Sequence, residues 1–268
     1  MAVDPAKTIK PPKVMRTIGI VTGISHISGA DYYIQLNDKV QSQLPWKYAG
    51  YSSKIALYSV NLEEYVEYLH DGRYDLVSAL LSDAADRVIK AGADFLVLAS
   101  NTAHMTVPTI KARHPYFPIL HIADCCAMKL KEHNIKCVGL VGTAHTMKGD
   151  YIRKRLEAHG LKVVVPKKDC VHQEMERIIE TELSFNKFIS KSRDFFIDTI
   201  RNDLVREQGA EGCILGCTEI ELLVKQDQIA EVPLFNSAQL HIDAAVEVQL
   251  CRKNVWDFEP TTHWKCRL

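Results

Sequence analysis

The chain has 268 residues, and its 33 basic and 33 acidic side chains give a formal net charge of zero at pH 7. This balance excludes a partner selected by bulk charge, so we expect no nucleic acid and no membrane surface as a partner. Hydrophobic residues make up 47% of the chain, which suits a globular protein of one large domain or two small ones.

Strands and helices are expected to alternate through the first half of the chain. Residues 1–15 carry lysines and a Pro-Pro pair without apolar periodicity, which indicates a flexible tail. The 75–91 stretch is the clearest helix, because its apolar residues recur at helical spacing and a glycine follows it. The run Phe-Leu-Val-Leu-Ala at 95–99 is typical of a strand buried on both faces of a parallel sheet. Further strands are expected at 17–22 and 54–60, and a further helix at 31–44.

The second half repeats this alternation. Helices are expected at 145–159, 171–183, 190–208 and 238–250, and strands at 136–142, 161–165, 212–215 and 233–235. Strand, helix and strand in regular succession predict an α/β fold with parallel strands.

Three landmarks recur in the same order and indicate an internal duplication. Ile-Gly-Ile-Val at 18–21 matches Val-Gly-Leu-Val at 138–141, and Pro-Ile-Leu at 118–120 matches Pro-Leu-Phe at 233–235. Between them, a glycine, an alanine and an acid lead into the strands that end at Ser100 and Cys217. We therefore predict two pseudo-symmetric lobes, each a parallel sheet flanked by helices, with the active site in the cleft between them.

The expected division of the chain follows from this repeat. The segments are a tail at 1–15, lobe 1 at 16–122, lobe 2 at 123–236, a C-terminal helix at 237–255 that packs back on lobe 1, and a tail at 256–268.

Ser100 and Cys217 occupy equivalent positions, each just past a buried strand, and should face one another across the cleft. Two groups on opposite faces of a small molecule suit proton transfer at a stereocentre. A polar, electropositive site can lower the pKa of a thiol from about 8.5 towards neutrality, whereas a serine hydroxyl is a poor base. We expect Cys217 to remove a proton unaided and Ser100 to abstract one slowly, or to donate one through water.

The strings around this pair resemble those of the aspartate/glutamate racemase family. Ser-Asn-Thr-Ala-His at 100–104 is similar to the family's Cys-Asn-Thr-Ala-His, and Gly-Cys-Thr-Glu at 216–219 matches its second string. The resemblance covers residues 16–250, and Glu219 places the chain nearer the aspartate racemase branch. Two departures are Ser100 in place of the first catalytic cysteine, and Thr-Gly-Ile-Ser-His at 22–26 in place of the family's Gly-Gly-Met-Gly-Pro loop.

This resemblance implies a PLP-independent racemase that acts on aspartate and/or glutamate without a cofactor or a metal. In the family, the second-lobe cysteine serves the L-enantiomer, so Cys217 implies a preference for L-substrates. A small acidic amino acid is the implied ligand and a homodimer the implied assembly. Because no apolar leader opens the chain, we expect a cytoplasmic protein with reduced thiols. Most of the seven cysteines besides Cys217 are expected to be buried or incidental thiols.

Hydrogen-bond donors for the substrate carboxylate are expected beside the two catalytic positions, where helices begin. A threonine at such a position can equally be an N-cap that only satisfies its own helix. The candidate substrate-binding residues are Asn101, Thr102, Thr143, Thr146, Thr218 and, as a weaker candidate, Ser59.

Several assignments stay open at the level of sequence. His104 could polarise Ser100 or pack beneath the loop, and Arg73, Lys167 and Lys168 could bind a side-chain carboxylate or be surface charges. The alternative functions are a non-catalytic acidic amino-acid-binding relative, or a one-cysteine relative of the malonate decarboxylase or maleate isomerase type.

Overall fold

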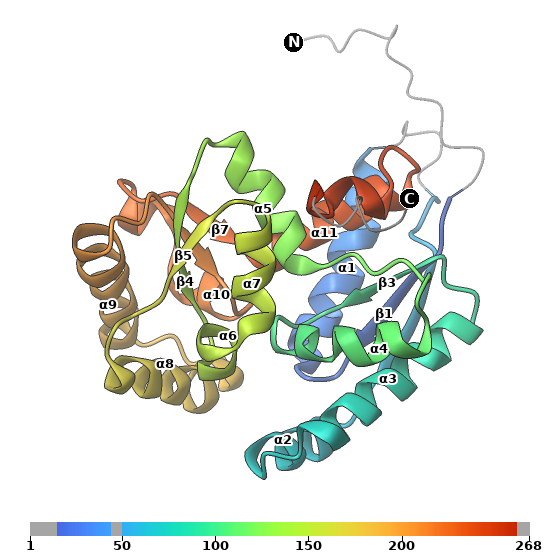
Figure 1. Cartoon of the computed structure of the whole chain (residues 1–268), viewed down its shortest axis with the longest axis horizontal. Helices are drawn as coiled ribbons and strands as arrows, with labels where there is room; N and C mark the ends of the chain where they lie inside the picture. Colours follow the sequence, from blue (N-terminus) through green and yellow to red (C-terminus); the bar gives the residue numbers. More distant parts are fainter. Residues whose placement is uncertain (1–14, 44–49, 262–268) are drawn as a thin grey trace, which may run out of the picture.

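The computed structural model describes residues 15–43 and 50–261, and it contains two parallel sheets flanked by helices (Figure 1). The first sheet has the strand order β2-β1-β3, and the second has the order β5-β4-β6-β7. The predicted α/β class with two parallel, helix-flanked sheets is therefore confirmed. The strands are β1 (Ile18–Thr22), β2 (Ile55–Ser59), β3 (Phe95–Leu98), β4 (Cys137–Val141), β5 (Lys162–Val164), β6 (Cys213–Leu215) and β7 (Leu234–Asn236).

Helices fill the connections between these strands. In the first half they are α1 (His26–Ser42), α2 (Leu62–His70), α3 (Tyr74–Lys90), η2 (Thr102–Thr106), α4 (Val107–Arg113) and α5 (Ile122–Glu132). In the second half they are α6 (Ala144–Lys148), α7 (Asp150–Ala158), α8 (Asp169–Thr181), η3 (Leu183–Phe185), α9 (Ser190–Asp198), η4 (Thr199–Glu207), α10 (Ile220–Leu223), η5 (Gln226–Ile229), α11 (Ser237–Gln249) and η6 (Val255–Phe258). Among the helices described, none is long and apolar enough to cross a bilayer.

The two sheets are built alike, as the sequence repeat predicts. In the first sheet, β1 lies between β2 and β3, and Ser100 follows β3. In the second sheet, β4 lies between β5 and β6, and Cys217 follows β6. The isolated parallel bridge between Leu96 and Ile119 takes the place in the first sheet that β7 takes in the second. Gly19 and Gly139 hold equivalent positions, and a Cβ on either would lie within 3 Å of a neighbouring side chain. Glycine at these positions lets the covering layer approach the central strand closely.

Strands β1 and β3 of the first sheet are buried on both faces, since their successive residues point to opposite sides and all are buried. Ile18 and Ile20 belong to a core cluster with α1 and α11, whereas Val21 belongs to a second cluster with α3. This burial on both faces explains why the strands appear in the sequence as continuous apolar runs.

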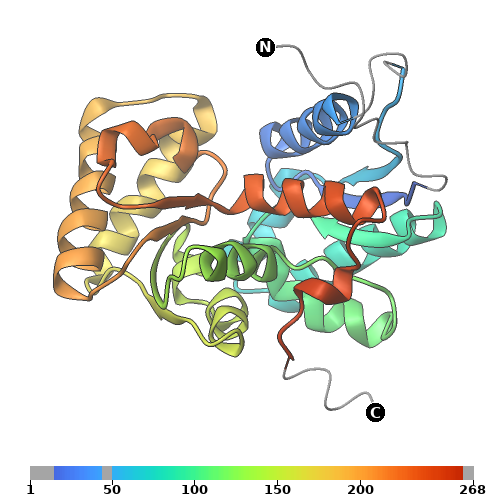
Figure 2. The same ribbon diagram turned by 90° about the horizontal axis from the view of Figure 1, so that it is seen from above.

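The helix α11 joins the two halves. It follows β7 directly and runs across to the first half, where it packs against α1 and α5 (Figure 2). The N–H of Arg16, at the start of the described chain, donates to the carbonyl of Gln249 at 3.0 Å. Where the boundaries between the predicted units fall stays a prediction, and most of both predicted tails lies outside the described residues.

Three local expectations are corrected by the structure. The helix predicted at 145–159 is two helices, because Gly149 is extended and a Cβ there would clash with Tyr151 and with the His145 carbonyl. The helix predicted from residue 31 begins at His26, since Ser25 caps it by accepting from the Ser28 N–H. The helices at 62–70 and 107–113 were not expected from the apolar pattern.

Candidate active site

The two predicted catalytic residues lie just beyond the carboxyl ends of β3 and β6, the equivalent strands of the two sheets. The segments that follow β1, β4 and β7 begin at the same ends of the strands. In parallel α/β sheets, this edge is where ligands bind. The contacts described next join these segments across the two halves of the molecule.

The thiol of Cys217 is bonded to a carboxyl group. Its Sγ lies 3.0 Å from Oε2 of Glu219, and the Thr218 hydroxyl donates to the same oxygen at 2.6 Å. Ser25, in the first half, donates to the other carboxyl oxygen at 3.0 Å. Glu219 is buried, with 7% of its surface exposed, so three donors from two halves satisfy one buried carboxyl group.

This environment raises the pKa of the Cys217 thiol well above its usual value, through burial first and then through the charge of Glu219. The expectation of an electropositive site that lets Cys217 act unaided is therefore wrong. Burial disfavours a thiolate, and a carboxylate at hydrogen-bonding distance disfavours it further. The same contact gives the thiol proton an acceptor, so this arrangement could serve in proton transfer.

Ser100 has a different neighbour. His104 donates from Nδ1 to the carbonyl oxygen of Ser100 at 2.8 Å and accepts from the N–H of Ile122 at Nε2, at 3.1 Å. Burial, followed by the nearby His241, lowers the pKa of His104 to about 3, so the ring is neutral. Both ring nitrogens are used, and His104 packs beneath the loop rather than polarising the Ser100 hydroxyl. Within residues 15–43 and 50–261, that hydroxyl takes part in no hydrogen bond.

Three of the predicted threonines meet between the two halves. The hydroxyl of Thr102 lies 3.3 Å from that of Thr143 and 3.4 Å from that of Thr146. Thr143 also caps α6 by accepting from the Thr146 N–H, so it has the N-cap role and a cross-molecule contact together. These hydroxyls form a cluster of neutral donors and acceptors at the meeting point of η2 and α6.

Asn101 joins the halves by a different route. Its Nδ2 donates to the hydroxyl of Ser237 at 2.9 Å, and Ser237 donates to the carbonyl of Leu215 at 2.8 Å. Leu215 is the last residue of β6, two residues before Cys217. Asn101 therefore holds the loop after β3 against the strand that carries Cys217.

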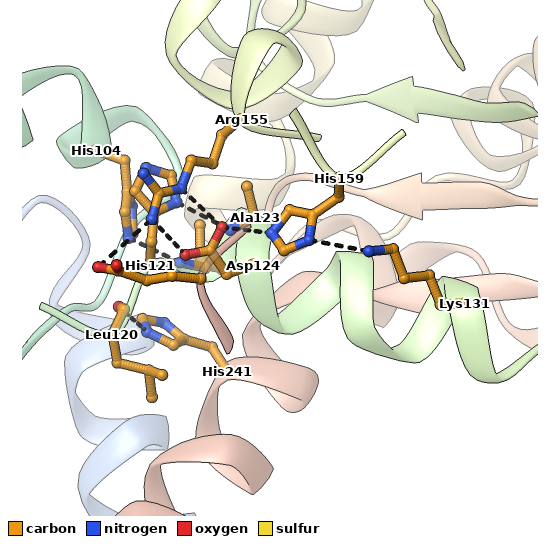
Figure 3. A network of polar contacts seen from close by, with 11 residues as sticks. His104, Leu120, His121, Ala123, Asp124, Lys131, Arg155, His159 and His241 are labelled. Atoms are coloured by element: carbon orange, nitrogen blue, oxygen red, sulfur yellow. Dashed lines mark hydrogen bonds and ion pairs between the residues drawn. The ribbon is translucent and has the colours of Figure 1, made fainter. Parts of the chain in front are cut away.

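A buried ionic network lies next to His104 (Figure 3). Asp124 on α5 is 1% exposed, and it accepts from Arg155 at 2.7 and 2.8 Å and from His159 at 2.8 Å. Three histidine rings lie beside this network. The centroid of the His104 ring is 4.5 Å from that of His121 and 5.7 Å from that of His241. Because Arg155 is committed to Asp124, its charge holds α7 against α5.

The remaining predicted residues lie apart from these contacts. Ser59 is exposed and borders a groove between α1 and β2, which Thr22 and His26 also line. Arg73 pairs with Asp75 and Lys167 with Glu207, and both ion pairs are exposed. Lys168 is likewise exposed. Of the two alternatives for these cations, the structure favours surface charges.

Residues that the sequence pattern missed carry much of this geometry. Glu219 was noted only as a mark of the family branch, although it stands two residues after Cys217. Ser25 and Ser237 each follow a strand and begin a helix, which is the signal that could have found them. Of the cysteines that the structure describes, Cys125, Cys126 and Cys213 are buried.

Comparison with known proteins gives concordant results. The broad specificity amino-acid racemase RacX of Bacillus subtilis is 24% identical over 238 residues, which are 87% of this chain and 98% of RacX. A candidate Asp/Glu racemase from Yersinia pestis has a crystal structure that superposes with a TM-score of 0.79 at 37% identity, over 88% of this chain and 100% of that one. An aspartate racemase homologue from Pyrococcus horikoshii superposes with a TM-score of 0.72 at 31% identity, over 88% and 99% of the two chains.

The family model of the Asp/Glu/hydantoin racemases matches residues 21–245, which include both candidate catalytic positions and the contacts of Ser25, Asn101 and Thr102 with the second half. The chain belongs to the Asp/Glu/hydantoin racemase family.

Proposed function

We propose that this chain is a PLP-independent racemase that acts on aspartate and/or glutamate and favours the L-enantiomer. Membership of the racemase family supports an isomerase, and the similarity to an aspartate racemase homologue supports acidic substrates. The observation that carries the proposal is the 3.0 Å contact between Cys217 Sγ and Glu219 Oε2, at the position that the repeat pairs with Ser100.

The proposed mechanism is asymmetric. The thiol proton of Cys217 passes to Glu219, and the thiolate removes the α-proton from an L-amino acid. The carbanion then takes a proton on its opposite face, from the Ser100 hydroxyl or from water beside it. Abstraction from a D-amino acid by Ser100 is slow, because its hydroxyl has no base beside it among the described residues.

The substrate carboxylate must be stabilised as charge builds up in the transition state. Neutral donors close to both catalytic positions are suited to this role, because they need no reorganisation when the proton leaves. We assign it to the hydroxyls of Thr102, Thr143 and Thr146 and to the amide of Asn101, because the one hydroxyl proton of Thr218 is donated to Glu219.

Proton NMR in D2O tests the proposal directly. We expect the Cα proton of L-aspartate or L-glutamate to exchange faster than that of the D-enantiomer, and Cys217→Ala to abolish the exchange. Cys251→Ser, at an exposed cysteine away from the candidate site, is the matched control and should retain full activity. The proposal fails if neither enantiomer of either acid exchanges. Ligand-induced thermal stabilisation without exchange would then indicate a binding protein, and turnover of malonates or maleate would indicate a one-cysteine relative.

A further inference from the structure

Two phenol hydroxyls near the site are buried without a hydrogen-bond partner: those of Tyr65 on α2 and Tyr151 on α7. Tyr65 is 2% exposed. An unsatisfied buried hydroxyl costs about 1–3 kcal/mol relative to a bonded one, so two of them close to one site need an explanation.

Both tyrosines converge on η2, the turn that carries Thr102. Tyr65 belongs to the core cluster that contains Ala103, and α7 packs directly on η2. The hydroxyls of Thr146 and Thr102 lie close enough to Tyr151 to lower its pKa, but neither meets it in hydrogen-bonding geometry. Burial is the larger effect and raises the pKa of Tyr151 to about 12, so both phenols keep their protons.

The backbone next to Tyr151 leaves room for its ring. Gly149 lies directly under the ring, and any side chain there would clash with it. The break between α6 and α7 at this glycine thus places a phenol beside the threonine cluster. Tyr65 approaches from the other half of the molecule, so the pair lies on both sides of the expected cleft.

The charged groups around the pair are acidic or already paired. Glu176 accepts from the Ala144 N–H and helps to raise the pKa of Tyr151. His145 has a pKa lowered by burial. Lys148 pairs with Asp169 at 2.8 Å, and no lysine or arginine in the described chain bonds to the threonine cluster or to the two phenols. The hydrogen-bond donors at the threonine cluster and the two phenols are therefore neutral.

We propose that Tyr65 and Tyr151 form the side-chain subsite of the racemase and donate hydrogen bonds to an oxygen at the end of the substrate's side chain. The inference rests on the proposed function. A carboxylate and a carboxamide both present such an oxygen, and neutral donors discriminate weakly between them. The subsite therefore accepts glutamine and asparagine alongside glutamate and aspartate, and rejects alanine, which has no distal oxygen.

The test compares α-proton exchange of L-glutamate, L-glutamine and L-alanine in the wild type, in Tyr65→Phe and in Tyr151→Phe. Tyr116→Phe, at a phenol that is 90% exposed, is the matched control. We expect glutamine within about tenfold of glutamate in the wild type, and each subsite variant to lower the glutamine-to-alanine ratio of kcat/KM by about tenfold, as for one lost hydrogen bond.

Thermal unfolding separates this role from a structural one. Because neither hydroxyl has a partner in the fold, both variants should melt at or above the wild-type temperature. A ratio that does not change, or a loss of stability that shows the hydroxyl to be bonded already, overturns the subsite, while exchange of L-glutamate still supports a racemase. If no amino acid exchanges, the proposed function fails, and the subsite is judged by whether each variant loses the thermal stabilisation that L-glutamine gives the wild type.

Discussion

The two halves of the site occupy equivalent positions in two similar sheets but differ in chemistry. In the second half, Cys217 is followed at two residues by Glu219, whose carboxyl group accepts from the thiol at 3.0 Å. In the first half, Ser100 is followed at two residues by Thr102, a neutral hydroxyl that contacts threonines of the other half. The second half pairs the Cys217 thiol with a carboxyl group that can accept its proton. The first half pairs the less acidic Ser100 hydroxyl with Thr102, a neutral hydrogen-bond donor.

This difference shows that the duplicated fold places Ser100 and Cys217 at equivalent positions, whereas their neighbouring side chains decide how readily each can give or take a proton. The pKa of Cys217 is raised by burial and by Glu219, so its thiolate forms only if the proton has a destination. His104 is near Ser100 but is held neutral, with both nitrogens bonded to the main chain. In the proposed mechanism, the asymmetry between the L- and D-directions follows from these neighbours as much as from Cys217 and Ser100 themselves.

Glu219→Gln is expected to have the largest effect, because it removes the carboxyl group beside Cys217 and leaves neither half with such a proton acceptor. We expect kcat/KM for the L-substrate at pH 7 to fall by about a hundredfold, the usual worth of a general base. As the pH rises towards the pKa of Cys217, the thiol ionises without help and the deficit shrinks. Rates of α-proton exchange against pH measure this, with Glu221→Gln on α10 as the control. A deficit that is constant with pH would mean that Glu219 only holds the loop.

Ser100→Cys sharpens the comparison from the other side. A thiol in the first half should raise exchange of the D-enantiomer by about tenfold, since a thiol ionises far more readily than a hydroxyl and its thiolate can accept the α-proton. The D-rate should remain below the L-rate, because the residue two positions on is still Thr102 rather than a carboxylate. Separate initial rates for the two enantiomers decide the point. Equal rates would show that Glu219 is not what distinguishes the halves.

The sequence predicted the features that depend on local pattern. The buried run at 95–99, the collinear repeat and the two strings after the equivalent strands were enough to predict parallel sheets and the place of Ser100 and Cys217. Helix α2 was missed although Asn61 caps it, because its buried side is narrow and Tyr65 is the one residue of the helix that is buried.

The electrostatics of the site could not be predicted in the same way. The pKa of Cys217 depends on which groups surround it after folding, and Ser25, 194 positions away, helps to hold Glu219 against it. The role of His104 likewise depends on the N–H of Ile122, which belongs to another element. Contacts between distant segments decide the chemistry here, and spacing along one segment carries no information about them.

His104 gives the mildest test, because it asks whether the histidine beside Ser100 is structural. Burial lowers the pKa of His104 to about 3, that of His241 to about 4, and that of His121 well below its usual value. The unfolded chain binds protons at these side chains from about pH 6.5 downward, whereas the folded chain does not, so stability is full above that pH and is lost as the pH falls towards 4. Together, three such groups lower the free energy of unfolding by up to about 4 kcal/mol for each unit that the pH falls in this range.

His104→Gln should remove about 1.4 kcal/mol per pH unit from this slope and leave the pH dependence of α-proton exchange unchanged. Denaturant unfolding between pH 4 and 6.5 measures the slope, with His26→Gln at an exposed position as the control. An altered activity profile would assign His104 to proton transfer and give the first half a base after all. An unaltered profile with a shallower slope would leave Cys217 as the titrating group, so the pH dependence of the exchange would report on the second half alone.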